Sequence, residues 1–227
     1  MVAPKVKKRC AYCGHQRPNT DDHVVSRALY PPSKASSRVQ RITVPACKEC
    51  NAGWKDAEVQ FRNILLISGE PNAPVRELWE GKTRRSFGYV DGPRRLRDLL
   101  AQMVPIQTPA GERHMVYPGR DERVMQVLRK VIRGLCHHHN LLTAVKDGQV
   151  WADVQQFEVP PAFLADMTFA HVEADILSYR FGEVEDEDIH SFWLLTFYER
   201  TPFLGIVFRS LESRARFEAS AQKLGAG

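Results

Sequence analysis

Apolar side chains recur every three or four positions in several segments of this chain, which is the spacing of one face of an α-helix. The pattern predicts a helix over about residues 48–68 and a strongly amphipathic helix from Asp121, its expected N-cap, to Leu135. A shorter helix is expected over residues 96–103 and a last helix over residues 211–224. Helices therefore account for much of the chain, but not for all of its apolar segments.

Other apolar runs are short and rich in β-branched and aromatic residues, which is typical of strands. These runs occupy residues 22–25, 41–45, 176–181, 192–198 and 203–208. The first two precede the first helix and are expected to pair with each other. The last two are expected to form a hairpin that turns around Arg200, Thr201 and Pro202.

The segment GEPNAP, residues 69–74, interrupts the helical pattern and reads as a linker. It divides the chain into a small unit over residues 1–68 and a separate α+β domain over residues 69–227, in which we expect an antiparallel sheet. The predicted fold class of the whole chain is α+β.

Composition and charge narrow the classes of protein that this sequence can belong to. The chain has 227 residues, of which 43% are hydrophobic, but no apolar run long enough to span a membrane. The basic N-terminus lacks the apolar segment of a secretory signal, so we expect a cytoplasmic protein. The first 62 residues carry 12 Lys and Arg against 5 Asp and Glu, whereas the remainder carries 20 against 22. A basic N-terminal segment is typical of one that approaches phosphates, although a merely solvated surface is equally compatible.

Four of the five cysteines form two CxxC pairs, Cys10 with Cys13 and Cys47 with Cys50. Two such pairs supply the four thiolates of a tetrahedral zinc site, and a shell of four protein ligands makes the zinc structural. In a cytoplasmic chain this spacing favours metal over disulfides. The long insert between the pairs indicates that they clasp an additional element.

That insert contains Asp22 and His23, and Asn51 directly follows the second pair. Phosphodiester hydrolysis needs a base that deprotonates water and a cation that stabilises charge on the phosphate. Histidine is largely neutral near pH 7, and carboxylate and amide oxygens suit Mg²⁺ or Mn²⁺. Adjacent strand residues point to opposite sides, so Asp22 and His23 can reach one phosphate only where the strand ends or bends.

The segments CAYC (10–13), DDHVVSRALYPP (21–32) and ITVPACKECNAGW (42–54) resemble a bacterial subgroup of the HNH endonuclease family that has two CxxC zinc knuckles. The resemblance extends over residues 8–63. It implies a zinc-clasped ββα-metal (HNH) unit, in which a hairpin precedes a helix. It also implies hydrolysis of double-stranded DNA with one divalent ion, and a place in bacterial or phage DNA metabolism, with defence against phage as one such role.

Matching positions give this chain's residues their expected roles. His23 matches the general base, and Asp22 and Asn51 match the protein ligands of Mg²⁺ or Mn²⁺. The expected DNA contacts are Lys55, Arg27 and Lys48. The central Asn of the family motif is replaced here by Gln40 or Arg41, which is expected to weaken activity.

Three functional hypotheses follow. The first is a metal-dependent DNA endonuclease whose C-terminal domain selects targets, binds a protein partner or forms a homodimer. The second is a zinc-stabilised module that binds nucleic acid with weak or no cleavage. The third is a toxin-like or regulatory chain that acts only with another protein.

Other residues receive structural interpretations. The Cys136–His139 tract is expected to end a helix, since consecutive residues splay around it and cannot all ligate one ion. Lys82, Arg84 and Arg85 are expected in an exposed loop, with an extended DNA track as the alternative.

Overall fold

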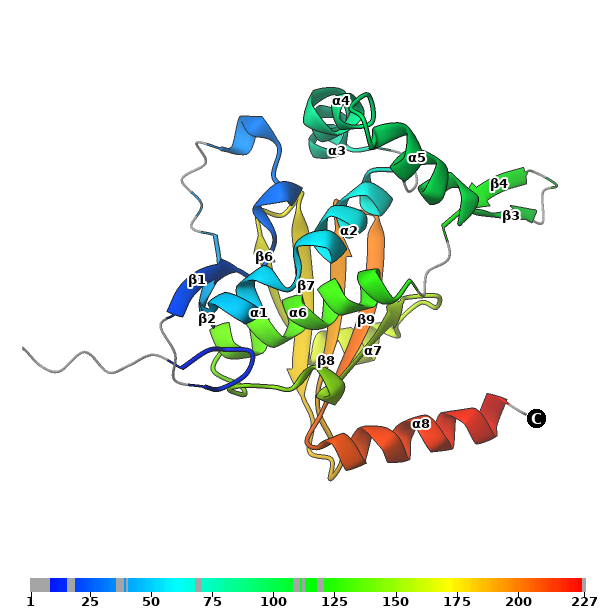
Figure 1. The fold of residues 1–227 in the computed structure, drawn as a ribbon. Coiled ribbons are helices and arrows are strands. Elements are labelled where there is room, and N and C mark those ends of the chain that lie inside the picture. The colour runs from blue at the N-terminus through cyan, green and yellow to red at the C-terminus, as the bar shows by residue number, and fades with distance from the viewer. Residues whose placement is uncertain are drawn as a thin grey trace, which may run out of the picture.

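The computed structural model describes residues 9–15, 19–35, 39, 41–67, 71–107, 111, 113–117 and 121–225 (Figure 1). Over these residues the fold is α+β, as predicted. A five-stranded antiparallel sheet has the order β5-β9-β8-β7-β6, and two further sheets have two strands each. No helix in the described ranges has both the length and the apolar character needed to cross a membrane.

The N-terminal segment forms a hairpin followed by helices. Strand β1 (Asn19–His23) pairs antiparallel with β2 (Thr43–Cys47). Strand β1 lies two to three residues before its predicted bounds, and β2 lies two residues after its predicted bounds. The single helix predicted after them is divided into α1 (Lys48–Ala52) and α2 (Lys55–Ile67). The break falls at Gly53, a poor helix former, and at Trp54, whose indole packs edge-on against Tyr12 with 5.9 Å between the ring centroids.

The large sheet confirms the three strands predicted in the second half of the chain. They are β7 (Leu177–Glu183), β8 (Ile189–Phe197) and β9 (Thr201–Phe208). The β8–β9 turn centres on Tyr198 and Glu199, earlier than predicted. Both have positive φ angles, 52° and 64°, which match the twist of a tight hairpin. Strands β5 (Val150–Val154) and β6 (Thr168–Val172) form the two edges and were not predicted.

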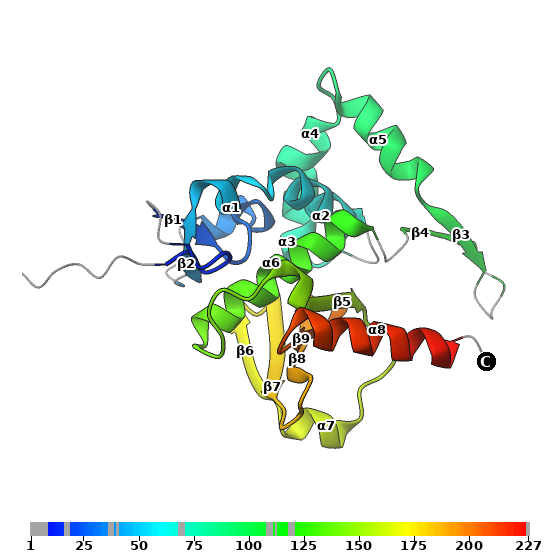
Figure 2. The same cartoon turned by 60° about the horizontal axis from the view of Figure 1, so that its bottom comes forward.

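Helix α6 (Glu122–His138) lies between the large sheet and the N-terminal hairpin (Figures 1 and 2). It begins at the predicted N-cap, where the Asp121 carboxylate accepts a 2.8 Å hydrogen bond from the Arg123 amide. A continuous cluster of buried apolar residues runs from the hairpin through α6 into the sheet. The two predicted units therefore share one core, with α6 at its centre.

Glycines permit the closest approaches of α6. A Cβ atom added to Gly134 would lie 2.7 Å from a methyl group of Val24, just beyond β1. A Cβ atom added to Gly205 on β9 would lie 2.3 Å from Ile132. The helix is thus packed tightly on both of its sides.

The remaining elements lie around this body. Helix α7 (Pro161–Ala165) precedes strand β6 of the large sheet, and α8 (Leu211–Gly225) follows strand β9. Four further elements project away from the body in both ribbon views, beyond α3 (Ala73–Leu78), whose N-cap is Asn72 in the predicted linker (Figures 1 and 2). They are α4 (Arg84–Ser86), α5 (Gly92–Ala101), β3 (Val104–Gln107) and β4 (Arg113–Val116).

Candidate functional site

The four cysteines of the CxxC pairs meet at one end of the hairpin. Cys10 and Cys13 lie in a turn, Cys47 ends β2 and Cys50 lies in α1. The turn is fixed to β2 by a 2.7 Å hydrogen bond from the Ala11 amide to the Pro45 carbonyl. It closes through Gly14, whose φ of 75° favours glycine. Local turn geometry and strand pairing therefore bring together two pairs that are distant in the sequence.

The geometry of this cluster fits a metal ion. All four Sγ atoms lie within 4.8 Å of one another, and the Sγ atoms of Cys13 and Cys47 are 3.9 Å apart. Zinc–sulfur bonds of about 2.3 Å arranged as a tetrahedron place neighbouring sulfurs about 3.8 Å apart. The cysteines are free thiols. The cluster could hold a metal ion and is consistent with structural zinc.

Electrostatics at Cys10 also suit a metal ligand, because metals bind the thiolate. Burial alone would raise the pKa of Cys10, but hydrogen bonds from the backbone amides of Cys47, Cys13 and Tyr12 outweigh it. The pKa of Cys10 is lowered to about 7. This stabilisation of the thiolate is local to Cys10, because burial raises the pKa of Cys47 and of Cys50.

His23 is the last residue of β1 and is partly buried. Burial lowers its pKa, and the nearby Arg27 and Arg41 guanidinium groups lower it further. Within the described part of the chain, its Nδ1 atom is buried and has no hydrogen-bond partner. The lowered pKa favours the neutral form of the imidazole, which lies beside two positive charges, and this arrangement suits a base that acts on a phosphate.

Asp22 lies in a different environment from His23. Its carboxylate is only 7% exposed and accepts a 2.8 Å hydrogen bond from the Tyr12 hydroxyl. The Lys130 ammonium of α6 lies 3.1 Å from its Oδ2 atom and 3.3 Å from Oδ1. Burial raises the pKa of Asp22, and the Lys130 charge and the Tyr12 hydrogen bond partly oppose that rise.

Lys130 joins Asp22 to the rest of the site. It is 1% exposed, donates at 2.6 Å to Glu58 of α2 and at 2.9 Å to the His23 carbonyl. The second carboxylate oxygen of Glu58 accepts a 2.9 Å hydrogen bond from Ser26. All three protons of the ammonium are therefore used, and the network fixes the backbone on both sides of His23.

Asn51 contacts the start of β1. Its side-chain amide donates a 2.8 Å hydrogen bond to the Thr20 hydroxyl, which itself bonds to the Ala46 carbonyl. Strand alternation places Thr20 and Asp22 on one side of β1 and His23 on the other. No hydrogen bond between described residues joins Asn51 to Asp22 or His23.

The remaining site predictions are placed as follows. The expected DNA contacts Lys55, Arg27 and Lys48 are all exposed. Gln40 lies outside the described residues. Arg41 donates a 2.9 Å hydrogen bond to the Lys34 carbonyl in the β1–β2 connection and lies 4.0 Å from the Tyr30 ring centroid. Arg41 thus stabilises the connection that follows His23.

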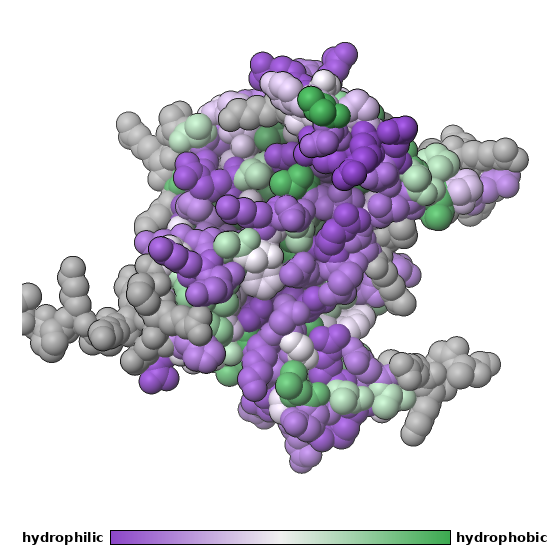
Figure 3. Space-filling view, viewed as in Figure 1, coloured by the Kyte–Doolittle hydropathy of each residue, from purple (hydrophilic) through white to green (hydrophobic). Residues whose placement is uncertain are grey.

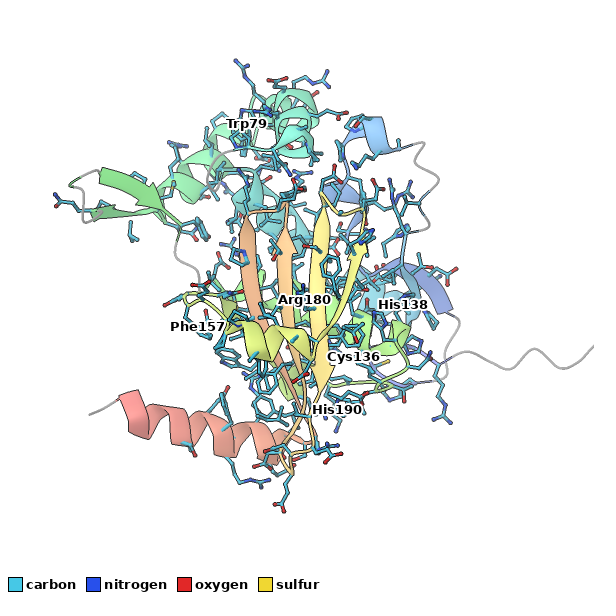
Figure 4. All side chains as sticks on the ribbon, turned by 180° about the vertical axis from the view of Figure 1, so that it is seen from behind. Trp79, Cys136, His138, Phe157, Arg180 and His190 are labelled. Carbon is cyan, nitrogen blue, oxygen red and sulfur yellow. The ribbon has the colours of Figure 1, made fainter. Side chains whose placement is uncertain are left out.

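The Cys136–His139 tract ends α6, as predicted (Figure 4). Cys136 is fully buried in the core, and His139 packs against Phe181 and contacts the Tyr179 hydroxyl at 2.9 Å. Over the described ranges, the four-cysteine cluster is the only group of three or more potential ligands close enough to hold a metal ion.

Comparison with family models, curated proteins and solved structures found no match. The functional interpretation therefore depends on the residues of this chain. Of these, the sequence did not point to Lys130, Glu58 or Tyr12. Lys130 lies in a helix whose apolar face accounts for its pattern, and its partners are 72 to 108 positions away.

Proposed function

We propose that this chain is a zinc-clasped nuclease of the HNH type, in which His23 acts as the general base on a DNA phosphodiester. The observation that carries the proposal is the position of His23. It is a partly buried imidazole whose pKa is lowered by burial and by Arg27 and Arg41, and it ends the strand that pairs with the cysteine-bearing strand β2.

The proposed reaction is assigned to these side chains. His23 accepts a proton from water as the water oxygen bonds to phosphorus. The bond from phosphorus to the 3′ oxygen then breaks, which leaves a 5′-phosphate and, after protonation by solvent, a 3′-hydroxyl. The positive charges of Arg27 and Arg41 stabilise the extra negative charge on the phosphate.

Asp22 does not fit the role of a Mg²⁺ or Mn²⁺ ligand in this conformation. Both carboxylate oxygens lie within 3.3 Å of the Lys130 ammonium, which would repel a divalent cation, and one also binds Tyr12. Asn51 is directed towards Thr20. The proposed reaction therefore assigns no step to a divalent ion.

The same ion pair favours the second candidate function, a zinc-stabilised module that binds nucleic acid without cutting it. Lys130 neutralises the carboxylate that the family resemblance assigns to metal binding. The basic hairpin would still attract a phosphate backbone. The two functions differ only in whether bound DNA is cleaved.

Nicking and binding of one supercoiled plasmid separate the candidates. Both are measured with purified protein in buffers that contain or lack Mg²⁺, and Mg²⁺ is omitted rather than chelated because a chelator would also remove zinc. Nicking supports the nuclease, and nicking only with Mg²⁺ would show that the reaction also needs a divalent ion. Binding without nicking supports the second candidate, and the absence of both contradicts both proposals.

A further inference from the structure

The projecting part of the chain carries an exposed cluster of arginines. We define the arm as residues 84–101, which comprise α4, α5 and the turn between them. Five arginine side chains in the arm are exposed, namely Arg84, Arg85, Arg94, Arg95 and Arg97. The surface over α4 and α5 is mostly hydrophilic in the space-filling view, with exposed apolar residues such as Val90 among the polar ones (Figure 3). The structure thus places a concentrated positive charge away from the zinc-clasped hairpin.

The arm has a defined shape. The Gly92 amide bonds to the Tyr89 carbonyl at 2.7 Å, and Arg95 donates at 3.1 Å to the Ser86 carbonyl across the turn. A Cβ atom on Gly92 would lie 2.3 Å from the Phe87 backbone, so only glycine fits this turn. Leu99 is 2% exposed and anchors α5 to the core. The arginines are therefore presented on a fixed element.

Helix periodicity places Arg94 and Arg97 together on α5, on the side opposite the anchoring leucine. In the described part of the chain, none of the five arginines forms an ion pair with a carboxylate. The pKa of the Arg62 guanidinium in α2 is lowered mainly by burial and further by the nearby positive charge of Arg95. The arm also contains the exposed Asp91 and Asp98, so its five arginines and two aspartates leave a net charge of +3, which favours a polyanionic partner.

We propose that the arm is a second DNA contact, which binds the phosphate backbone at a distance from the hairpin. This inference rests on the proposed function, since it names the same partner. Helix α2 begins at the hairpin and ends towards the arm, and its 13 residues span about 20 Å at the usual helical rise. That length corresponds to about six base pairs of duplex. The protein would therefore contact DNA at two places roughly half a helical turn apart.

The test compares two double variants that each remove two positive charges. Arg94→Gln/Arg97→Gln changes the arm. Lys146→Gln/Arg216→Gln is the control for the loss of two formal charges elsewhere, with Lys146 before β5 and Arg216, which pairs with Asp188, in α8. Affinity for a duplex of about 20 base pairs is measured as a function of salt, because each phosphate contact adds about 0.9 to the slope of log K against log salt. Melting temperatures confirm that both variants are folded.

The arm variant is expected to bind roughly tenfold more weakly and to lose almost two from the magnitude of the salt slope. The control is expected to match the wild type. An arm variant with wild-type affinity and slope overturns the inference and leaves the proposed nuclease intact if the wild type nicks DNA. A weakened arm variant of a protein that binds but never nicks supports the arm and contradicts the nuclease. A wild type that does not bind DNA contradicts both.

Discussion

Replacement of Lys130 by methionine tests the buried network beside His23. Methionine keeps the approximate volume of the lysine side chain but removes its charge and three donors. The carboxylates of Asp22 and Glu58 then lose the ammonium that lies 2.6–3.3 Å from them. The His23 carbonyl loses its 2.9 Å hydrogen bond as well.

The expected cost follows from the burial of these groups. Removal of one partner from a buried ion pair destabilises a protein by about 3–5 kcal/mol, because the remaining charge is uncompensated. For a chain of this size each kcal/mol lowers the melting temperature by about 2–4 °C, so a loss of roughly 6–20 °C is expected. Lys55→Met is the matched control. Lys55 is exposed, and such substitutions change stability by about 0.5 kcal/mol or less.

The loss should also depend on pH. In the folded wild type, burial raises the pKa of Asp22 while Lys130 opposes the rise, so the variant raises this pKa further. A carboxyl group whose pKa is higher in the folded than in the unfolded protein stabilises the fold at pH values below its unfolded pKa, about 3.9. That stabilisation is lost as the pH rises through the folded-state pKa. The deficit of Lys130→Met should therefore be largest near about pH 8 and smaller near about pH 5.

Thermal unfolding at both pH values, followed by circular dichroism, measures these effects. A Lys130→Met variant with the same melting temperature as the Lys55→Met control at both pH values would refute the buried ion pair. A large deficit that does not change with pH would refute the assignment of the uncompensated charge to Asp22.

Three further outcomes are expected. The purified protein should contain one zinc per chain by elemental analysis. Cys50→Ser should lose the zinc, and Cys136→Ser, outside the cluster, should retain it. Equal zinc contents in the two variants would contradict the four-cysteine site. Gly134→Ala should lower the free energy of unfolding by about 1–3 kcal/mol, because its methyl group would overlap the stiff Val24 side chain. An unchanged or raised free energy of unfolding would show that the helix and hairpin can separate without cost. A fragment of residues 1–68 should give no cooperative melt even with zinc, because it lacks α6; a cooperative melt would show that it folds alone.

The sequence predicted the parts of the site that depend on local spacing. The geometry of each CxxC pair is local, the first in a turn and the second at the start of α1, so the four-cysteine cluster could be inferred before any contact was known. The amphipathic helix and its cap at Asp121 were also predicted, because apolar periodicity and capping are local properties. The strands of the sheet centre were evident for the same reason, since they are long and apolar.

The parts that were missed depend on contacts between distant residues. Lys130 is buried only because Asp22 and Glu58 surround its ammonium, and nothing near position 130 in the sequence indicates this. The edge strands β5 and β6 are short, and β6 is largely exposed, so their pairing comes from the neighbouring strands. The division of the chain at residue 69 was inferred from a linker pattern, whereas packing around α6 joins the residues on either side.

The most direct test of the proposed function compares wild type, His23→Ala and His171→Ala in plasmid nicking and in gel-shift binding, in one Mg²⁺ buffer. His171 is an exposed histidine on β6 and serves as the control. Loss of a general base lowers the rate by about 10²–10⁴-fold, whereas affinity depends on phosphate contacts. We expect His23→Ala to bind DNA normally and to lose nicking to that extent, with His171→Ala unchanged in both. Nicking by His23→Ala at the wild-type rate would contradict the role of His23 and, with it, the HNH-type mechanism proposed for this site.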